Sequence, residues 1–122
     1  MTLALDLVKI PVEDLAASVS FYEEALGLKA GFVSETYGWA QLDGASFALA
    51  LYVPGKGGGG RTPGGTVDFH LSHDQIDTLE QQVSKSAPDA TVHANADGSR
   101  SLEFSDPDGN ILKIMERRND GA

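Results

Sequence analysis

The stretch Asp106-Pro107-Asp108-Gly109-Asn110, followed by Ile111-Leu112-Lys113-Ile114-Met115-Glu116, decides the fold of this chain. Pro107 presets the backbone angle that the second position of a tight turn needs, and Gly109 tolerates a positive φ. Residues 104–106 and 111–116 are therefore expected to form the two arms of one hairpin.

Alternation gives the second arm of this hairpin one apolar face and one mixed face. Leu112 and Ile114 point to one side of the strand, and Ile111, Lys113 and Met115 point to the other. A lysine in the middle of a strand, between apolar neighbours, is unusual. Lys113 is therefore the first candidate for a functional residue.

Length and composition limit what any motif can mean. The chain has 122 residues, of which 41% are hydrophobic, and this suits a single domain, 1–122, with one core. The net charge of -9 argues against nucleic acid as a partner, and it fits either a cationic ligand or simply an acidic surface. Cysteine is absent, which excludes disulfides and thiolate chemistry. The first residues lack a basic start and a long apolar run, so we expect no signal peptide, no membrane span and a cytoplasmic location.

The first half of the chain shows strand and helix patterns in turn. Residues from about 3 to 12 alternate like a half-buried strand, and a helix follows that Asp14 or Ser18 can cap and that ends at Gly27. Three short strands are expected next, at about 29–35, 39–42 and 47–53. Residues 54–65 are rich in glycine and predict a flexible connector or a mobile lid. A phosphate-binding loop is disfavoured there, because no Lys-Ser/Thr ending runs into a helix.

The pattern then begins again, and this internal repeat predicts the architecture. Residues 67–71 correspond to residues 8–12, and a second helix and a second hairpin follow in the same order. We therefore expect an α+β fold of two paired βαβββ modules, at about 3–53 and 66–116. Each module would place a helix on the outer face of its strands, and together the strands would form a curved, trough-shaped mixed sheet.

The trough is lined by the residues that do not face the helices. Small residues, two aromatic residues and a few charges are typical of a small-molecule site, although the same face could pack an oligomer interface or a closed core. Unpaired charges would be costly in such a core, which favours the ligand site. The candidate ligand-binding residues are Leu7, Lys9, Trp39, Gln41, Ala50, Tyr52, Thr66, Asp68, His70, Ser101, Glu103, Lys113 and Met115.

Two motifs together resemble the vicinal oxygen chelate superfamily, which includes glyoxalase I, fosfomycin resistance proteins, extradiol dioxygenases and bleomycin resistance proteins. They are Val12-Glu13-Asp14-Leu15 leading to Phe21-Tyr22-Glu23-Glu24-Ala25-Leu26-Gly27-Leu28, and the turn at 106–110. The resemblance covers nearly the whole chain. It implies paired βαβββ modules and a homodimer whose sites lie in the troughs.

The resemblance also implies where the metal ligands of a metal-dependent member would lie. Those places are Leu7, Ala50, Thr66 and Lys113. None of these side chains is a ligand that a divalent cation favours, and lysine adds a positive charge. Only His70 shares the trough face, whereas His73 is expected at the start of the second helix and His93 in a polar strand or loop. We therefore expect neither a metal nor any other cofactor.

Two functions remain open. In the first, the trough binds a small molecule without chemistry, with Trp39 and Tyr52 stacking on it and Asp68 and Glu103 holding a cationic group. In the second, a metal-independent enzyme of the lyase or isomerase type uses Lys113 with one of these carboxylates as an acid–base pair. The same charges could also form only a structural salt bridge. In each case Lys113 is expected to be charged and paired with Asp68 or Glu103.

Overall fold

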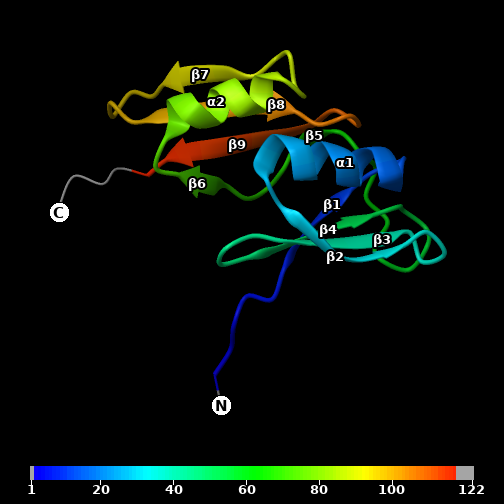
Figure 1. Cartoon of the computed structure of the whole chain (residues 1–122). Coiled ribbons are helices and arrows are strands. Elements are labelled where there is room, and N and C mark those ends of the chain that lie inside the picture. The colour runs from blue at the N-terminus through cyan, green and yellow to red at the C-terminus, as the bar shows by residue number, and fades with distance from the viewer. Residues whose placement is uncertain (1, 118–122) are drawn as a thin grey trace.

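The computed structural model describes residues 2–117 and confirms the α+β class (Figure 1). Two helices and nine strands lie within the described residues. In chain order they are β1 Val8–Pro11, α1 Leu15–Leu26, β2 Lys29–Ser34, β3 Trp39–Asp43, β4 Ala48–Tyr52, β5 Gly65–Thr66, β6 Leu71–His73, α2 Ile76–Ser84, β7 Thr91–Ala94, β8 Arg100–Ser105 and β9 Asn110–Glu116.

The two modules form two open mixed sheets. The first sheet has the order β1-β4-β3-β2, and the second has the order β5-β9-β8-β7, with β6 also pairing with β9. In both sheets the opening strands run parallel to the last strand of the module, and the last two strands form a hairpin. The expected repeat is therefore present in the topology. Equivalent pairs even keep their register, with Gln41 opposite Ala50 and Glu103 opposite Lys113.

The first strand is shorter than the sequence predicts. It begins at Val8 rather than near residue 3, and Leu3 and Leu5 are 99% and 85% exposed. Figure 1 shows this N-terminal arm leaving the body of the molecule. Within residues 2–117, β1 pairs with β4 alone. Strand β4 begins at Ala48, and Val8 already pairs with Leu49, so β4 offers no partner to the residues before Val8. Alternation in the arm therefore has no strand to pair with.

The prediction of one strand at 67–71 is also wrong. Two short strands, β5 and β6, lie on either side of residues 67–70 instead. Thr66 pairs with Ile111, and Leu71 pairs with Ile114. The four residues 67–70 therefore lie opposite only two residues of β9, 112 and 113. Two extra residues must therefore bulge out of the ladder. We call residues 67–70 the bulge.

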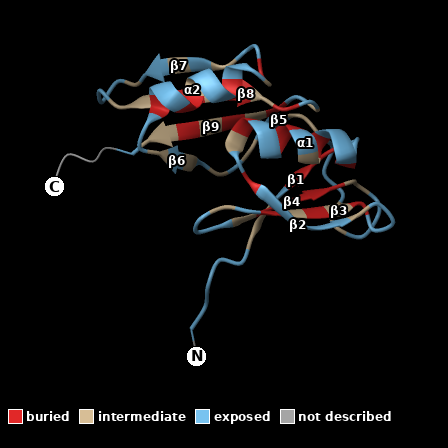
Figure 2. Cartoon of the chain, in the orientation of Figure 1, coloured by how far each residue is buried: buried red, intermediate tan, exposed pale blue. Residues whose placement is uncertain are grey.

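The helices join the two modules into one core. Helix α1 begins where Asp14 Oδ1 accepts from the Ala17 N–H (3.0 Å), and it ends at Gly27, whose φ of 68° suits glycine. Gln82 of α2 donates to the carbonyl of Ala25 in α1 (3.1 Å). Figure 2 shows buried residues in both sheets and on the inner sides of both helices. Neither helix among the described residues is long and apolar enough to cross a membrane.

The turn at 106–110 is confirmed, and it docks on the helix of the other module. Asp106, which is 5% exposed, accepts from the Tyr22 hydroxyl (2.7 Å), from the backbone N–H groups of Asp108 and Asn110 (both 2.9 Å) and from Asn110 Nδ2 (2.9 Å). Asn110 Nδ2 also donates to the Pro11 carbonyl at the end of β1 (2.8 Å). The hairpin turn of the second module is thereby bonded to both α1 and β1.

Asp108 adds a second link at the start of α1. Its carboxylate accepts from the Glu13 N–H (3.1 Å) and from the Ser18 hydroxyl (3.3 Å). Burial raises the pKa of Asp108, against these two hydrogen bonds, which lower it. Burial, with the negative charge of Asp106, also raises the pKa of the Tyr22 hydroxyl, so this group stays protonated and remains a donor.

We expect Tyr22→Phe to lower the free energy of unfolding by about 1–3 kcal/mol, because the buried Asp106 carboxylate loses a donor that no water replaces. Urea unfolding followed by circular dichroism measures the change. Tyr37→Phe is the matched control, since Tyr37 is 66% exposed. Equal stability of the two variants would show that the Tyr22 hydrogen bond does not hold the modules together.

Candidate functional site

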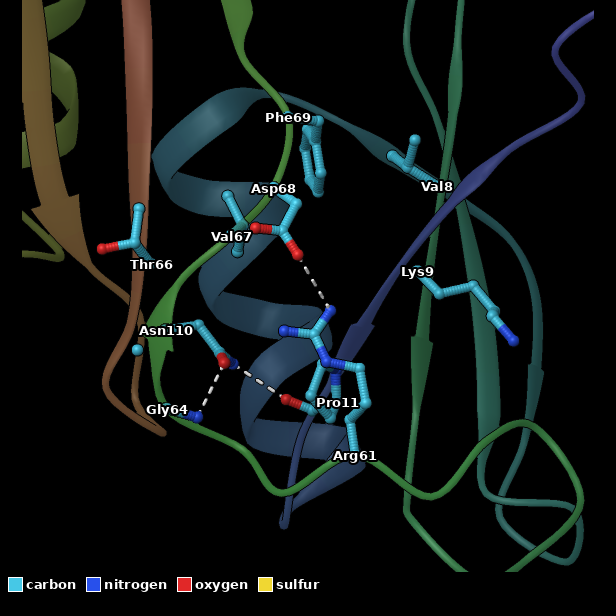
Figure 3. Close-up of a pocket in the computed structure, with 11 residues that line it drawn as sticks. Val8, Lys9, Pro11, Arg61, Gly64, Thr66, Val67, Asp68, Phe69 and Asn110 are labelled. Carbon is cyan, nitrogen blue, oxygen red and sulfur yellow. Dashed lines mark hydrogen bonds and ion pairs between the residues drawn. The ribbon is translucent and has the colours of Figure 1, made fainter.

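A pocket of about 230 Å³ lies at the seam between the modules (Figure 3). Strand β1 forms one wall with Val8, Lys9 and Pro11, and the start of the bulge forms the other with Asp68 and Phe69. Of the predicted site residues, this seam pocket brings together Lys9, Thr66 and Asp68. Phe69 and Val8 make part of its surface apolar.

Asp68 pairs with Arg61 in this pocket, not with Lys113. Arg61 Nη1 lies 3.7 Å from Asp68 Oδ2, and the two side chains are 61% and 87% exposed. Figure 3 shows Arg61 directed toward Asp68 and Lys9 pointing away from it. A pair this exposed contributes little to stability, so Asp68 remains available to a ligand.

The back of the seam pocket is fixed by the turn at 106–110. Asn110 Oδ1 accepts from the Gly64 N–H (2.8 Å), while its Nδ2 group bonds to Pro11 on the facing wall. Gly64 and Gly65 have φ values of 108° and 81°, which allow the connector to enter β5 here. Arg61 and Asn110 also line the pocket, and neither was among the residues predicted from the sequence. For Asn110 the signal was its place in the turn, whereas nothing local marks Arg61.

An aromatic surface on the first sheet is the second part of the site. Trp39 and Tyr52 are directly opposite each other on β3 and β4, and we call this pair the shelf. Trp39 also lines a hollow of about 370 Å³ with Phe32 and Tyr37, which are 55% and 66% exposed. Three aromatic side chains therefore border one open hollow, which Lys56, Gly57 and Gly58 of the glycine-rich segment also line.

The glycine-rich segment lies across the shelf. We call residues 55–60 the strap. An added Cβ at Gly58 would come within 2.8 Å of Tyr52 and 2.9 Å of Trp39, and one at Gly59 within 2.7 Å of the Tyr52 ring. Lys9 Nζ donates to the Gly58 carbonyl (2.7 Å) and lies 5.4 Å from the centre of the Tyr52 ring. The strap explains why Tyr52 is only 2% exposed on a sheet face that carries no helix.

The inner face of the second sheet carries Ser101, Glu103, Lys113 and Met115. Glu103 and Lys113 are directly opposite each other and half-buried. Lys113 nevertheless forms no ion pair among the described residues, so the expected pairing with Asp68 or Glu103 is not formed. Both side chains keep contact with solvent, which removes much of the drive to pair. Ser101 is buried, and its hydroxyl has no hydrogen-bond partner.

The remaining predicted residues lie elsewhere. His70 lies at the far end of the bulge, in a cavity of about 580 Å³ that also includes Phe47 and His73. His73 belongs to β6 and not to the start of α2, where the sequence placed it, and His93 lies in β7. Leu7 and Gln41 are half-buried, and Ala50 is fully buried beside Tyr52 on β4. Nine of the thirteen predicted residues are thus divided among the seam pocket, the shelf and the second sheet, while His70 lies in the cavity of about 580 Å³ and Leu7, Gln41 and Ala50 lie outside these sites.

The residues at the four positions where the resemblance implies metal ligands are not suited to bind a metal. Leu7, Ala50 and Thr66 offer no charged or imidazole ligand, and Lys113 offers an ammonium group. Within residues 2–117 no three His, Cys, Asp or Glu side chains gather in a way that could hold an ion. No step in the function proposed below therefore uses a metal.

Comparison with known proteins places this geometry in a family. The model of the Glyoxalase/Bleomycin resistance protein/Dioxygenase superfamily matches residues 4–114. A solved structure of a member of this superfamily, from Sphaerobacter thermophilus DSM 20745, is 26% identical, with a TM-score of 0.76, and the match covers 94% of this chain and 98% of that chain. A comparison with curated protein sequences finds no match.

Two further solved structures share the fold at lower identity. Lactoylglutathione lyase from Agrobacterium tumefaciens is 20% identical, with a TM-score of 0.82, and the match covers 98% of this chain and 97% of that chain. TnmS3, an antibiotic binding protein from Streptomyces sp. CB03234, is 24% identical, with a TM-score of 0.71 and coverage of 95% and 98%. The family model spans nearly all of the sequence, and the paired modules agree with it. The chain therefore belongs to the glyoxalase/bleomycin resistance protein/dioxygenase superfamily.

Proposed function

We propose that this protein is a metal-independent, cytoplasmic binding protein for aromatic, cationic small molecules. The observation that carries the proposal is the open aromatic hollow of about 370 Å³ on the first sheet, which Phe32, Tyr37 and Trp39 border together with Lys56. Aromatic faces attract both flat rings and cations. The net charge of -9 is compatible with a cationic ligand as well.

Two further observations support binding over catalysis. TnmS3, which shares the fold, is an antibiotic binding protein. In this chain the acid–base pair of Lys113 with Asp68 or Glu103, which the enzyme hypothesis needs, is not assembled. Asp68 pairs with Arg61, and Lys113 lies opposite Glu103 without forming an ion pair with it. Asp68 instead lies exposed at the seam, where a ligand's cationic group can reach it.

We expect nickel, zinc, iron and manganese to leave the melting temperature unchanged, because a ligand that binds only the folded state raises it and this donor set offers no tight site. Thermal unfolding with each metal in excess measures the effect, and a chelator-treated sample is the control. One tightly bound metal per chain, found by elemental analysis of the purified protein, would contradict metal independence.

Proflavine, a flat tricyclic cation, is the probe for the proposed function. We expect calorimetric titration to show saturable binding, and we expect Trp39→Leu to weaken it by about 3- to 10-fold, which corresponds to the loss of one stacking contact. Phe47→Leu is the matched control, since Phe47 lines the other cavity and not the hollow. Anthracene-9-carboxylate, of the same ring size but opposite charge, should bind more weakly. No saturable proflavine binding would refute the proposed function.

We also propose a homodimer. Exposed apolar side chains, among them Leu3, Leu5 and Val33, and the unpaired sheet edges at β2 and β7 support a symmetric partner. Light scattering coupled to size exclusion should therefore give a mass twice the 12.9 kDa of one chain at micromolar concentration. A monomer under these conditions would contradict the assembly without affecting the binding proposal.

A further inference from the structure

We propose that the strap and Lys9 cover the shelf in the free protein, in the place where a ligand would lie. A flat aromatic cation then binds between Trp39 and Tyr52 by displacing the strap and Lys9. The inference rests on the proposed function and adds a specific site, a lid and a residue that sets specificity. The site is the shelf, the lid is the strap at 55–60, and the residue is Lys9.

The contacts of the strap imitate those of such a ligand. The backbone at Gly58 lies so close to Tyr52 and the Trp39 ring, and that at Gly59 so close to the Tyr52 ring, that a Cβ at either position would clash. The Lys9 ammonium lies 5.4 Å from the centre of the Tyr52 ring, within the range of a cation–π contact. The shelf is thus already occupied by a flat group and a cation from the chain itself.

The strap is also held weakly enough to be displaced. The Gly55 N–H donates to the Gly59 carbonyl (3.1 Å) within the strap, whereas the bond from Lys9 to Gly58 (2.7 Å) is the one hydrogen bond between the strap and the sheet among the described residues. Five of its six residues are glycine, so it buries almost no side-chain surface. Glycine also loses more conformational freedom than other residues when it is ordered, and lifting the strap restores that freedom.

The surroundings of Lys9 favour a cation as the displacing ligand. Lys9 and Asp68 both line the seam pocket, but the Lys9 side chain points away from Asp68 while it holds the strap, so a released ammonium has to turn back toward the seam to reach that carboxylate. A ligand cation then takes over the contact with the Tyr52 ring. The strap leads directly to Arg61, which pairs with Asp68, so its movement also affects that pair. Lys9 therefore opposes the binding of a cation while it covers the ring and permits it once released.

The position of the strap is tested first without any ligand, by acrylamide quenching of Trp39. Trp39 is the single tryptophan of the chain, so its fluorescence reports on the shelf alone. We expect Lys9→Met to raise the quenching constant about twofold or more, since the strap loses its hydrogen bond to the sheet. Gly58→Ala should do the same, because the new Cβ meets Trp39 and Tyr52.

Two matched variants control this experiment. Gly60 has open space around its Cβ position, so Gly60→Ala changes the strap without a clash. Lys29→Met removes a lysine charge from the exposed strand β2. Both should quench like the wild type, and thermal unfolding should show that all four variants are folded. Unchanged quenching in both Lys9→Met and Gly58→Ala would overturn the inference.

The role of the strap in binding is tested with proflavine. If the strap covers the shelf in about nine of ten molecules, removing it tightens the apparent dissociation constant about tenfold. We therefore expect Lys9→Met and Gly58→Ala to bind proflavine about 5- to 10-fold more tightly than the wild type, and Gly60→Ala and Lys29→Met to bind it equally. The binding of proflavine should also raise the exposure of the wild-type strap, measured by hydrogen exchange at residues 55–60.

The two failures are distinguishable. Equal proflavine affinity in all five proteins would overturn the strap inference and leave the proposed function standing. No proflavine binding in any of them would overturn the proposed function, and with it the displacement of the strap by ligand. Tighter binding of anthracene-9-carboxylate than of proflavine by the wild type would overturn the assignment of a cation.

Discussion

The structure depends on one buried carboxylate. Asp106 accepts four hydrogen bonds, and three of the donor groups belong to the turn while the fourth is the hydroxyl of Tyr22 in the other module. A buried carboxylate without these donors would be strongly destabilising, so the turn and helix α1 each require the other. Asn110 extends the same network to Pro11 on β1 and to Gly64 on the connector. The turn at 106–110, one of the motifs by which the family is recognised, is therefore a structural junction between the modules. The candidate binding surfaces lie elsewhere, at the seam pocket and the shelf.

The junction determines where binding surfaces can form. It fixes the ends of β1 and β5, and the chain between β5 and β6 then carries four residues opposite two on β9. The resulting bulge places Asp68 toward the seam and His70 toward the other cavity. On the first sheet the register shifts between Ala30 and Phe32 of β2, but the pairing of β3 with β4 is regular, and the strap covers the face of these two strands. The bulge and the regular β3–β4 hairpin thus produce two different kinds of surface.

The sequence was sufficient for the local elements but not for their neighbours. Asp14, Gly27 and the turn at 106–110 carry their own geometry, and each was predicted correctly. Leu3 and Leu5 alternate like a strand, but alternation does not show whether a neighbouring strand exists. The bulge is hidden for a similar reason, since alternation continues through Val67 and Phe69 while the pairing register changes. The prediction that Lys113 pairs with Asp68 or Glu103 was wrong because charged side chains on a solvated face need not meet. The contact of Lys9 with Gly58 was not predicted because it requires residues 55–60 to fold back over the sheet, and no local pattern encodes that.

The internal repeat also has a consequence for stoichiometry. The position equivalent to Trp39 in the second module is Ser101, and the position equivalent to Tyr52 is Met115, which lies opposite Ser101 just as Tyr52 lies opposite Trp39. The backbone is duplicated, yet only the first copy carries aromatic rings at these positions. The pseudo-symmetry of the scaffold is thus broken by two side chains, and a ligand that stacks on such an aromatic pair would find one pair in the two structural halves, not two.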